Sequence, residues 1–235
     1  LGIPMWVSMG IGVSALLFFT GTLPLSLLGE TLFEGMDAFA LLAVPLFILT
    51  GDALVRTGLS NKLLSVAEAT AGSFRSGFGT STVLGCGFFS CISGSDAAGC
   101  ASVGRMTIDR LVSSGYPRPY AAALVASGAC TGILIPPSIA YIVIGLVLGV
   151  STATLFVAAV IPGTLILVSI MLTNVVMNRR RGYENAGKAF SFSNWLDSIW
   201  DGRYALMIPF IILGGIYSGI FTPTEAASVA VVSTL

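Results

Sequence analysis

The chain has 235 residues, of which 55% are hydrophobic and 9% are charged, and its mean hydropathy is +0.93. Soluble domains carry about 25% charged residues, so this balance excludes a soluble globular protein and indicates a lipid-embedded one. Eleven basic and eleven acidic residues cancel, so no net charge would attract nucleic acid, and we expect no nucleic-acid partner.

Long apolar stretches follow one another from the start of the chain. At roughly 25 to 30 residues per segment and loop, the length allows about six to eight crossing or re-entrant segments in one all-α polytopic membrane domain. A first span is predicted from Met5 to Leu28, followed by an acidic loop from Gly29 to Asp37. A second span is predicted over about Ala38 to Val55, and Arg56 ends it.

The apolar run from Phe78 to Met106 is dense in Gly, Ser and Ala and has basic residues on both flanks. A single crossing would place these flanks on opposite faces of the membrane, against the positive-inside bias. We therefore predict a re-entrant hairpin with half-helices at about Thr80 to Ile92 and Ala97 to Thr107, turning at residues 93–96. The alternative is a single kinked span.

The next apolar stretch, from Pro119 to Leu148, contains two adjacent prolines, Pro136 and Pro137. Two prolines remove two backbone donors from a helix interior, which predicts a broken helix. A further span is predicted over about Thr154 to Met177, closed by a run of three arginines.

The last part of the chain changes from polar to apolar. The segment from Tyr183 to Arg203 is polar and contains two tryptophans, which predicts a short interfacial helix. A final complete span is predicted from Tyr204 to Ile220. Thr222 or Thr224 can then cap a new helix, with a proline in its first turn.

The hairpin makes the charge distribution one-sided. With the N-terminus inside, Glu30 and Glu34 are predicted to face the periplasm. The basic residues are predicted to be cytoplasmic, among them Arg56, Arg105, Arg118 and Arg181.

The four cysteines lie in apolar or small-residue segments, and the chain has no His to complete a mixed metal site. We interpret them as small packing residues and expect no bound metal from them. They are Cys86, Cys91, Cys100 and Cys130.

The two predicted breaks are the places where chemistry is expected. Non-helical backbone at membrane depth is tolerated only where it is buried in protein or lines a polar cavity. In secondary transporters, broken helices supply oxygen ligands for Na⁺ and half-helix N-termini for anionic substrate groups. The candidate Na⁺ and substrate ligands are Ser93, Gly94, Ser95, Asp96, Thr131, Gly132, Pro136, Pro137 and Ser138.

Both breaks also have purely structural interpretations. Small residues at the hairpin tip favour close helix packing, and adjacent prolines can simply kink a helix. Asp96 carries a charge that costs on the order of 3 kcal/mol near mid-bilayer, so it should face water or a cation. Asp52, a turn before Arg56, is interpreted as an interfacial residue.

An intramembrane enzyme is a remote alternative. The segment Ser93 to Asp96 partly matches the Gly-x-Gly-Asp element of intramembrane aspartyl proteases, but its first glycine is absent. A second intramembrane Tyr-Asp pair is also missing from the sequence. We therefore expect that the chain is not an enzyme.

Several segments, taken together, resemble one family, the large membrane subunit of the tripartite ATP-independent periplasmic (TRAP) transporters. The string GIYSGIFTPTEAA at residues 215–227 is similar to that family's most recognisable motif. The other matching segments are AVPLFILTG at 43–51, ISGS at 92–95, GYP at 115–117, GILIPPS at 132–138 and PG at 162–163.

The resemblance implies an inverted-repeat, elevator-type transporter fold and Na⁺-coupled import of organic acids, such as C4-dicarboxylates or sialic-acid-like carboxylates, across the bacterial inner membrane. It implies two partners, a periplasmic substrate-binding protein and a small four-helix membrane subunit, with Na⁺ as coupling ion and no cofactor. Family members are longer, so we expect a fragment with a first repeat at 1–178, a linker at 179–203 and the start of a second repeat at 204–235. The charged Asp96 departs from the family's usual uncharged tip, which leaves its role open.

Two rival functions remain. One is a dicarboxylate/sodium symporter of the same broad class that works without a binding protein. The other is a membrane-embedded enzyme or a passive channel, which would act without Na⁺ dependence.

Overall fold

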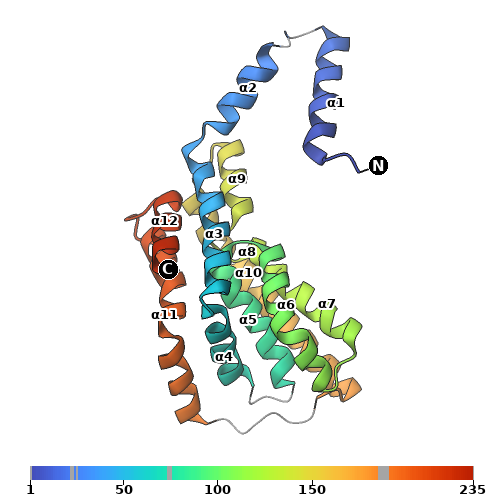
Figure 1. Ribbon diagram of the computed structural model, residues 1–235, viewed down its shortest axis with the longest axis vertical. Helices are drawn as coiled ribbons and strands as arrows, with labels where there is room; N and C mark the ends of the chain where they lie inside the picture. The colour runs from blue at the N-terminus through green and yellow to red at the C-terminus, as the bar shows by residue number, and fades with distance from the viewer. Residues whose placement is uncertain (1, 22–23, 25, 73–75, 185–190, 235) are drawn as a thin grey trace. The chain divides into compact units, whose positions relative to one another are not determined.

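The computed structural model describes residues 2–21, 24, 26–72, 76–184 and 191–234. The described residues form helices and connecting turns, with no strand among them (Figure 1). The chain divides into two compact units, residues 1–39 and residues 40–235.

The first unit corrects the prediction of one span from Met5 to Leu28. Helix α1 (Met5–Thr20) ends where Gly21 adopts a left-handed conformation, with its N–H donating to Leu17 O. Helix α2 (Ser26–Met36) then occupies most of the predicted acidic loop. Hydropathy alone does not register a left-handed glycine, so it joined two helices into one. The 16 residues of α1 extend about 24 Å, less than a hydrocarbon core of about 30 Å.

The second unit follows a short 3-10 helix, η1 (Phe39–Leu42), at the boundary. Its helices are α3 (Ala43–Arg56), α4 (Leu59–Ala71), α5 (Gly77–Ser93), α6 (Asp96–Ser113), α7 (Arg118–Ala129), α8 (Thr131–Leu134), α9 (Ile139–Leu148), α10 (Thr152–Arg181), α11 (Phe192–Tyr217) and α12 (Pro223–Thr234).

Four helical stretches among the described residues are long and apolar enough to cross a membrane. This confirms the prediction of an all-α polytopic membrane protein. The stretches are Phe39–Arg56, Arg118–Leu148, Thr152–Arg181 and Phe192–Tyr217.

The hairpin prediction is confirmed, and the single kinked span is excluded. Helix α5 ends at Ser93, Gly94 turns the chain with φ 61°, and α6 begins at Asp96 and packs back against α5. Both arms are longer than predicted, because α5 starts at Gly77 and α6 continues to Ser113. The sequence also predicts a loop from Gly72 to Gly79, but helix α5 already begins at Gly77, and residues 73–75 lie outside the described residues.

The broken helix is also confirmed. Helix α7 leads into the four-residue α8, residues 135–138 are not helical, and α9 starts at Ile139. The peptide bond between Pro136 and Pro137 is cis.

The separate interfacial helix predicted from Tyr183 to Arg203 is wrong. A single helix, α11, runs from Phe192 through the predicted start of the last span to Tyr217. Its polar half lies against α4, where Lys62 Nζ pairs with Asp201 at 2.9 Å and Trp195 Nε1 donates to Thr70. Gly202, although a weak helix former, lies within α11 and lets it approach Val66 of α4, so with these contacts the helix continues past the change in composition.

An apolar core of the second unit joins α3, the α5 arm of the hairpin, α11 and α12, with single residues from α4, α6, α9 and α10. Phe47, Phe89 and Ile212 are fully or almost fully buried there. Helix α12 packs on α3, and α11 packs on α4. The predicted cap at Thr222 is present, since its hydroxyl accepts from Glu225 N at 3.3 Å.

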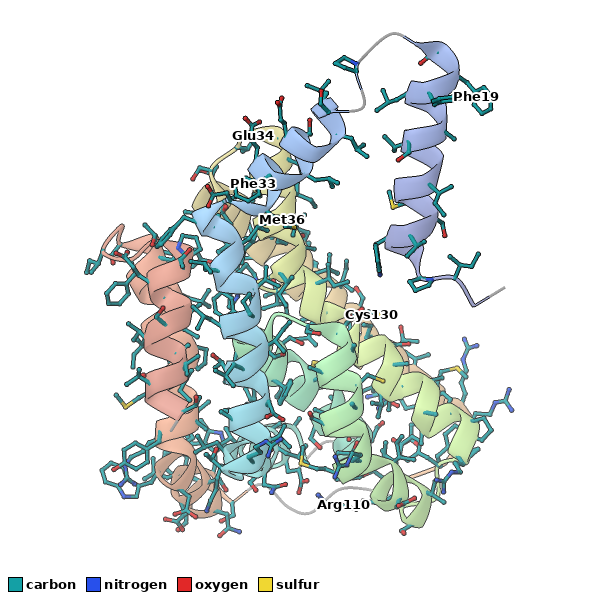
Figure 2. All side chains as sticks on the ribbon, turned by 45° about the horizontal axis from the view of Figure 1, so that its top comes forward. Phe19, Phe33, Glu34, Met36, Arg110 and Cys130 are labelled. Carbon is teal, nitrogen blue, oxygen red and sulfur yellow. The ribbon has the colours of Figure 1, made fainter. Side chains whose placement is uncertain are left out.

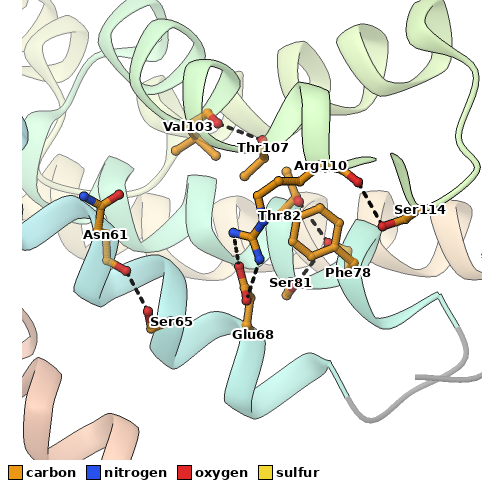
Figure 3. A network of polar contacts seen from close by, with 10 residues as sticks. All are labelled: Asn61, Ser65, Glu68, Phe78, Ser81, Thr82, Val103, Thr107, Arg110 and Ser114. Atoms are coloured by element: carbon orange, nitrogen blue, oxygen red, sulfur yellow. Dashed lines mark hydrogen bonds and ion pairs between the residues drawn. The ribbon is translucent and has the colours of Figure 1, made fainter. Parts of the chain in front are cut away.

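Ion pairs gather where α4, α6 and α11 expose charged residues, at the end of the second unit where Figure 2 labels Arg110. Arg110 of α6 forms two bonds to the Glu68 carboxylate of α4, at 2.7 and 3.0 Å, and stacks over the ring of Phe78 (Figure 3). Arg56 pairs with Asp52 at 2.6 Å on the surface of α3. Asp52 therefore has a local ion-pair partner, which is compatible with its interpretation as an interfacial residue. The sidedness of these residues in a membrane remains a prediction.

Candidate functional site: the hairpin tip and the helix break

The hairpin tip (residues 93–96) and the helix break (residues 135–138), 42 residues apart in sequence, lie in direct contact. Ile139 N, at the start of α9, donates to Gly94 O at 3.3 Å. A β-carbon on Gly94 would lie 2.7 Å from Pro137 O, and one on Gly132 would lie 2.8 Å from Asp96 N. Glycine therefore permits both approaches, and Gly94 additionally needs its left-handed φ.

Helix α3 closes the same region from another direction. A β-carbon on Gly51 would lie 3.0 Å from the β-carbon of Ser93. The α3 backbone thus comes close to the tip, and Ser93 is fully buried between these elements. The site is assembled from three separate stretches of the chain.

The hydroxyls at the tip are mostly engaged in local bonds. Ser95 caps α6, since its Oγ accepts from Ala98 N at 3.4 Å. Ser93 Oγ makes only long contacts of 3.5 Å with the backbone of Ser95. Thr131 Oγ1 donates to Gly128 O at 2.6 Å, which leaves its lone pairs free to accept.

Ser138 differs from these residues. Its side chain is fully buried, and its Oγ is without a hydrogen-bond partner among the described residues. Ser138 stands at the N-cap position of α9 but makes no side-chain cap bond. Because burying an unpaired hydroxyl costs about 1 to 3 kcal/mol, a ligand that bonds this oxygen would remove a real penalty.

Asp96 occupies the first turn of α6, and its Oδ1 accepts from Ala97 N at 2.7 Å. It is half-buried, so its carboxylate is neither sealed in the core nor fully in solvent. The positive end of the α6 dipole favours a negative charge at this position. This gives Asp96 a local role that needs no bound ion, beside its predicted role as a ligand.

The remaining candidates contribute backbone rather than side chains. Gly132, Pro136 and Pro137 carry no polar side-chain atoms, and the prolines leave the carbonyls one turn earlier without their helical donors. The N-terminal ends of α6 and α9 meet at the tip, beside the carbonyl end of α5. Such a junction offers hard oxygen ligands and positive helix ends within one small region.

The comparison with known families identifies the chain. The model of the tripartite ATP-independent periplasmic transporter, DctM component, matches residues 1–235. The chain belongs to the DctM family. The family is named for one component of a three-part transporter. Family membership together with the apolar helices makes the chain a multi-pass inner-membrane protein.

Individual relatives of this DctM-family chain carry transporter names. It is 34% identical to the isethionate TRAP transporter permease protein of Oleidesulfovibrio alaskensis, over 97% of the chain and 36% of the relative. It is 40% identical to the C4-dicarboxylate TRAP transporter large permease protein of Pseudomonas aeruginosa, over 86% and 47%. It is 32% identical to the sialic acid TRAP transporter large permease protein of Vibrio cholerae, over 97% and 53%.

The DctM-family chain spans about half the length, or less, of these curated relatives. The relatives are named as permeases, which agrees with the prediction that the chain is not an enzyme. The described residues contain no group of three or more His, Cys, Asp or Glu side chains that could hold a metal ion.

A second polar cluster, which was not predicted from the sequence, lies at the base of the hairpin. It contains Ser76, Tyr116, Asn174, Asn178 and Glu184. One signal was available: the two asparagines lie four residues apart in an apolar helix, on one face of it. Nothing local marked the Glu184 carboxylate, because its partners Phe78, Gly79 and Tyr116 lie 68 to 106 residues away.

Proposed function

We propose that the chain is the first part of the membrane subunit of a Na⁺-coupled importer of small organic acids. A periplasmic binding protein delivers the substrate, and a small four-helix membrane subunit completes the assembly. The fold of the whole is an inverted-repeat elevator, of which this chain contributes the first repeat and the beginning of the second.

The observation that carries the proposal is the contact between the hairpin tip and the helix break. Two interruptions in apolar helices meet at Gly94 and Pro137. Beside them the buried Oγ of Ser138 has no hydrogen-bond partner in the part of the chain that the structure describes. Hydroxyl and carbonyl oxygens suit a hard cation such as Na⁺, and helix N-termini suit an organic anion. We therefore assign Na⁺ to the oxygens of Ser93, Ser95 and Ser138 and the nearby backbone.

The substrate is proposed only as a class. Relatives are named for isethionate, C4-dicarboxylates and sialic acid, and others for ectoine and 2,3-diketo-L-gulonate. These names share the family and differ in the substrate, so relatedness favours an organic acid without choosing one. C4-dicarboxylates and sialic-acid-like carboxylates are the first compounds to test.

The experiment uses the full-length protein that contains this chain, with its small membrane subunit, in proteoliposomes. Uptake of a labelled acid is measured with and without the binding protein, and with an inward gradient of Na⁺ or of K⁺. The proposal expects uptake only with both the binding protein and Na⁺. Uptake without the binding protein would indicate the independent symporter, and uptake indifferent to Na⁺ would refute coupling.

A further inference from the structure

The base of the hairpin is capped by a carboxylate from a distant part of the chain. Helix α5 begins at Gly77, and its first backbone N–H groups have no helical partner. Glu184, beyond the end of α10, supplies the acceptor: Phe78 N donates to Oε1 at 2.9 Å and Gly79 N donates to Oε2 at 3.4 Å. The negative charge also complements the positive end of the α5 dipole.

The Glu184 carboxylate is itself held in place. Tyr116 OH donates to Glu184 Oε2 at 2.9 Å. Burial raises the pKa of Tyr116 above its ordinary value, so the phenol stays protonated as a donor at physiological pH. The backbone of Glu184 is fixed as well, because Asn178 Nδ2 donates to Glu184 O and Glu184 N donates to Asn178 Oδ1.

A second layer of buried contacts leaves this cluster little room to shift. Asn174 Nδ2 donates to Ser76 Oγ at 2.8 Å, and Ser76 Oγ lies 3.0 Å from Tyr116 OH. A β-carbon on Gly79 would lie 2.6 Å from both Asn174 Nδ2 and Tyr116 OH. The cluster thus ties α10 and the α6–α7 connection to the start of α5.

The other arm of the hairpin has its own attachment. Arg110 of α6 binds Glu68 of α4 through two bonds and covers the ring of Phe78 (Figure 3). Phe78 is also the residue whose backbone N–H donates to Glu184. The two arms are therefore held at their open end by two carboxylates from different helices or their extensions.

The geometry of α5 connects this base to the tip. A helix of 17 residues is about 25 Å long, so a tilt of about 5° at its base displaces its far end by about 2 Å. Displacements of about 1 Å are enough to impair a preorganised site. At the tip, the backbone bond that joins the hairpin to the break, from Ile139 N to Gly94 O, is long at 3.3 Å.

From this geometry we propose that Glu184 is a positioning residue, which sets the place of the hairpin tip against the helix break by anchoring the base of α5. The role at the ion site rests on the proposed function. The positioning itself does not, and the two can be tested separately.

The positioning is tested by the distance between tip and break. In the full-length protein, spin labels are attached to Ala97→Cys, at the exposed start of α6, and to Cys130, exposed beside the break, with all other cysteines replaced. Dipolar broadening of the spectrum reports the distance distribution between the labels. We expect a narrow distribution in the parent and a broad one in Glu184→Gln and Glu184→Ala.

Two further variants keep this test decisive if Glu184→Ala folds poorly. Tyr116→Phe removes one bond to the carboxylate and should broaden the distribution less than Glu184→Gln does. Asp109→Asn breaks an exposed ion pair with Arg118, at the same end of the second unit, and should leave the distribution narrow. An unchanged distribution in all the Glu184 variants overturns the proposal.

Transport supplies the second readout. Misplacing the tip should raise the Na⁺ concentration for half-maximal uptake by about three- to tenfold in Glu184→Gln, with most of the maximal rate retained at saturating Na⁺. Glu184→Asp, which keeps the charge, should restore part of this loss. A fall in maximal rate alone would mean a general folding defect and contradict positioning. Uptake without Na⁺ dependence in the parent would refute the proposed function and leave the spectroscopic result standing.

Discussion

Gly94 and Pro137 approach so closely that a β-carbon on the glycine would lie 2.7 Å from the proline carbonyl oxygen. Gly94 also has φ 61°, a conformation that other residues adopt at a cost. Two features of one residue therefore depend on the absence of a side chain.

These features predict that Gly94→Ala inserts into the membrane but loses at least about tenfold in uptake, because the tip must move away from the break. Gly149→Ala is the matched control, since Gly149 has φ 65° but open space around its missing β-carbon. It should lose about 1 kcal/mol of stability and keep its uptake. Equal uptake by both variants would show that the contact with Pro137 has no functional weight.

Ser138→Ala separates a ligand from a packing residue. Because Ser138 Oγ is buried without a partner in the described part of the chain, its removal should leave stability in Na⁺-free buffer unchanged or raise it by about 1 kcal/mol. If Ser138 binds Na⁺, added Na⁺ should raise the melting temperature of the parent and raise that of the variant less. An equal Na⁺ response in the two proteins would remove Ser138 from the ion site.

The topology is tested by labelling single cysteines with a membrane-impermeant reagent. The hairpin returns the chain to the face it entered from, so Lys62→Cys and Ser113→Cys should both react from the cytoplasmic side. Ser151→Cys, between α9 and α10, should react from the periplasmic side. Labelling of positions 62 and 113 from opposite faces would contradict the hairpin's re-entrant placement.

Arg110 should be poorly replaced by lysine. Its guanidinium binds Glu68 through two nitrogens, whereas an ammonium group cannot form that paired geometry. The pair is partly exposed, so we expect Arg110→Lys to lower the free energy of unfolding by no more than about 1 kcal/mol. Thermal unfolding in detergent measures this, and Glu68→Gln should add little further loss once Arg110 is changed.

The stability that Glu225 contributes at the start of α12 should fall as the pH is lowered. Glu225 Oε2 accepts hydrogen bonds from Thr222 N and from Thr222 Oγ1. The backbone bond chiefly, and the side-chain bond in addition, hold the pKa of the carboxyl below its ordinary value. A lowered folded-state pKa gives stability that is present above the unfolded pKa of about 4.3 and is lost as pH falls through the folded value. The melting-temperature difference between the parent and Glu225→Gln should therefore shrink on acidification. A difference that is constant from pH 7 to pH 3 would contradict this.

The membrane class and both breaks follow from the sequence by itself. Apolar length and low charge specify a lipid-embedded helical protein, and these are properties of composition rather than of packing. The turn at Gly94 and the break at Pro136 and Pro137 follow from residues whose backbone preferences act locally. Basic residues on both flanks then distinguished a hairpin from a span.

Only the tertiary structure decided which distant residues meet. The continuation of α11 past Arg203 depended on contacts with α4, which hydropathy does not report. The unpaired oxygen of Ser138 and the capping of α5 by Glu184 appear only when helices far apart in sequence are packed together. Local preferences determine where a helix can break, whereas burial and hydrogen bonding across the fold determine what the break faces.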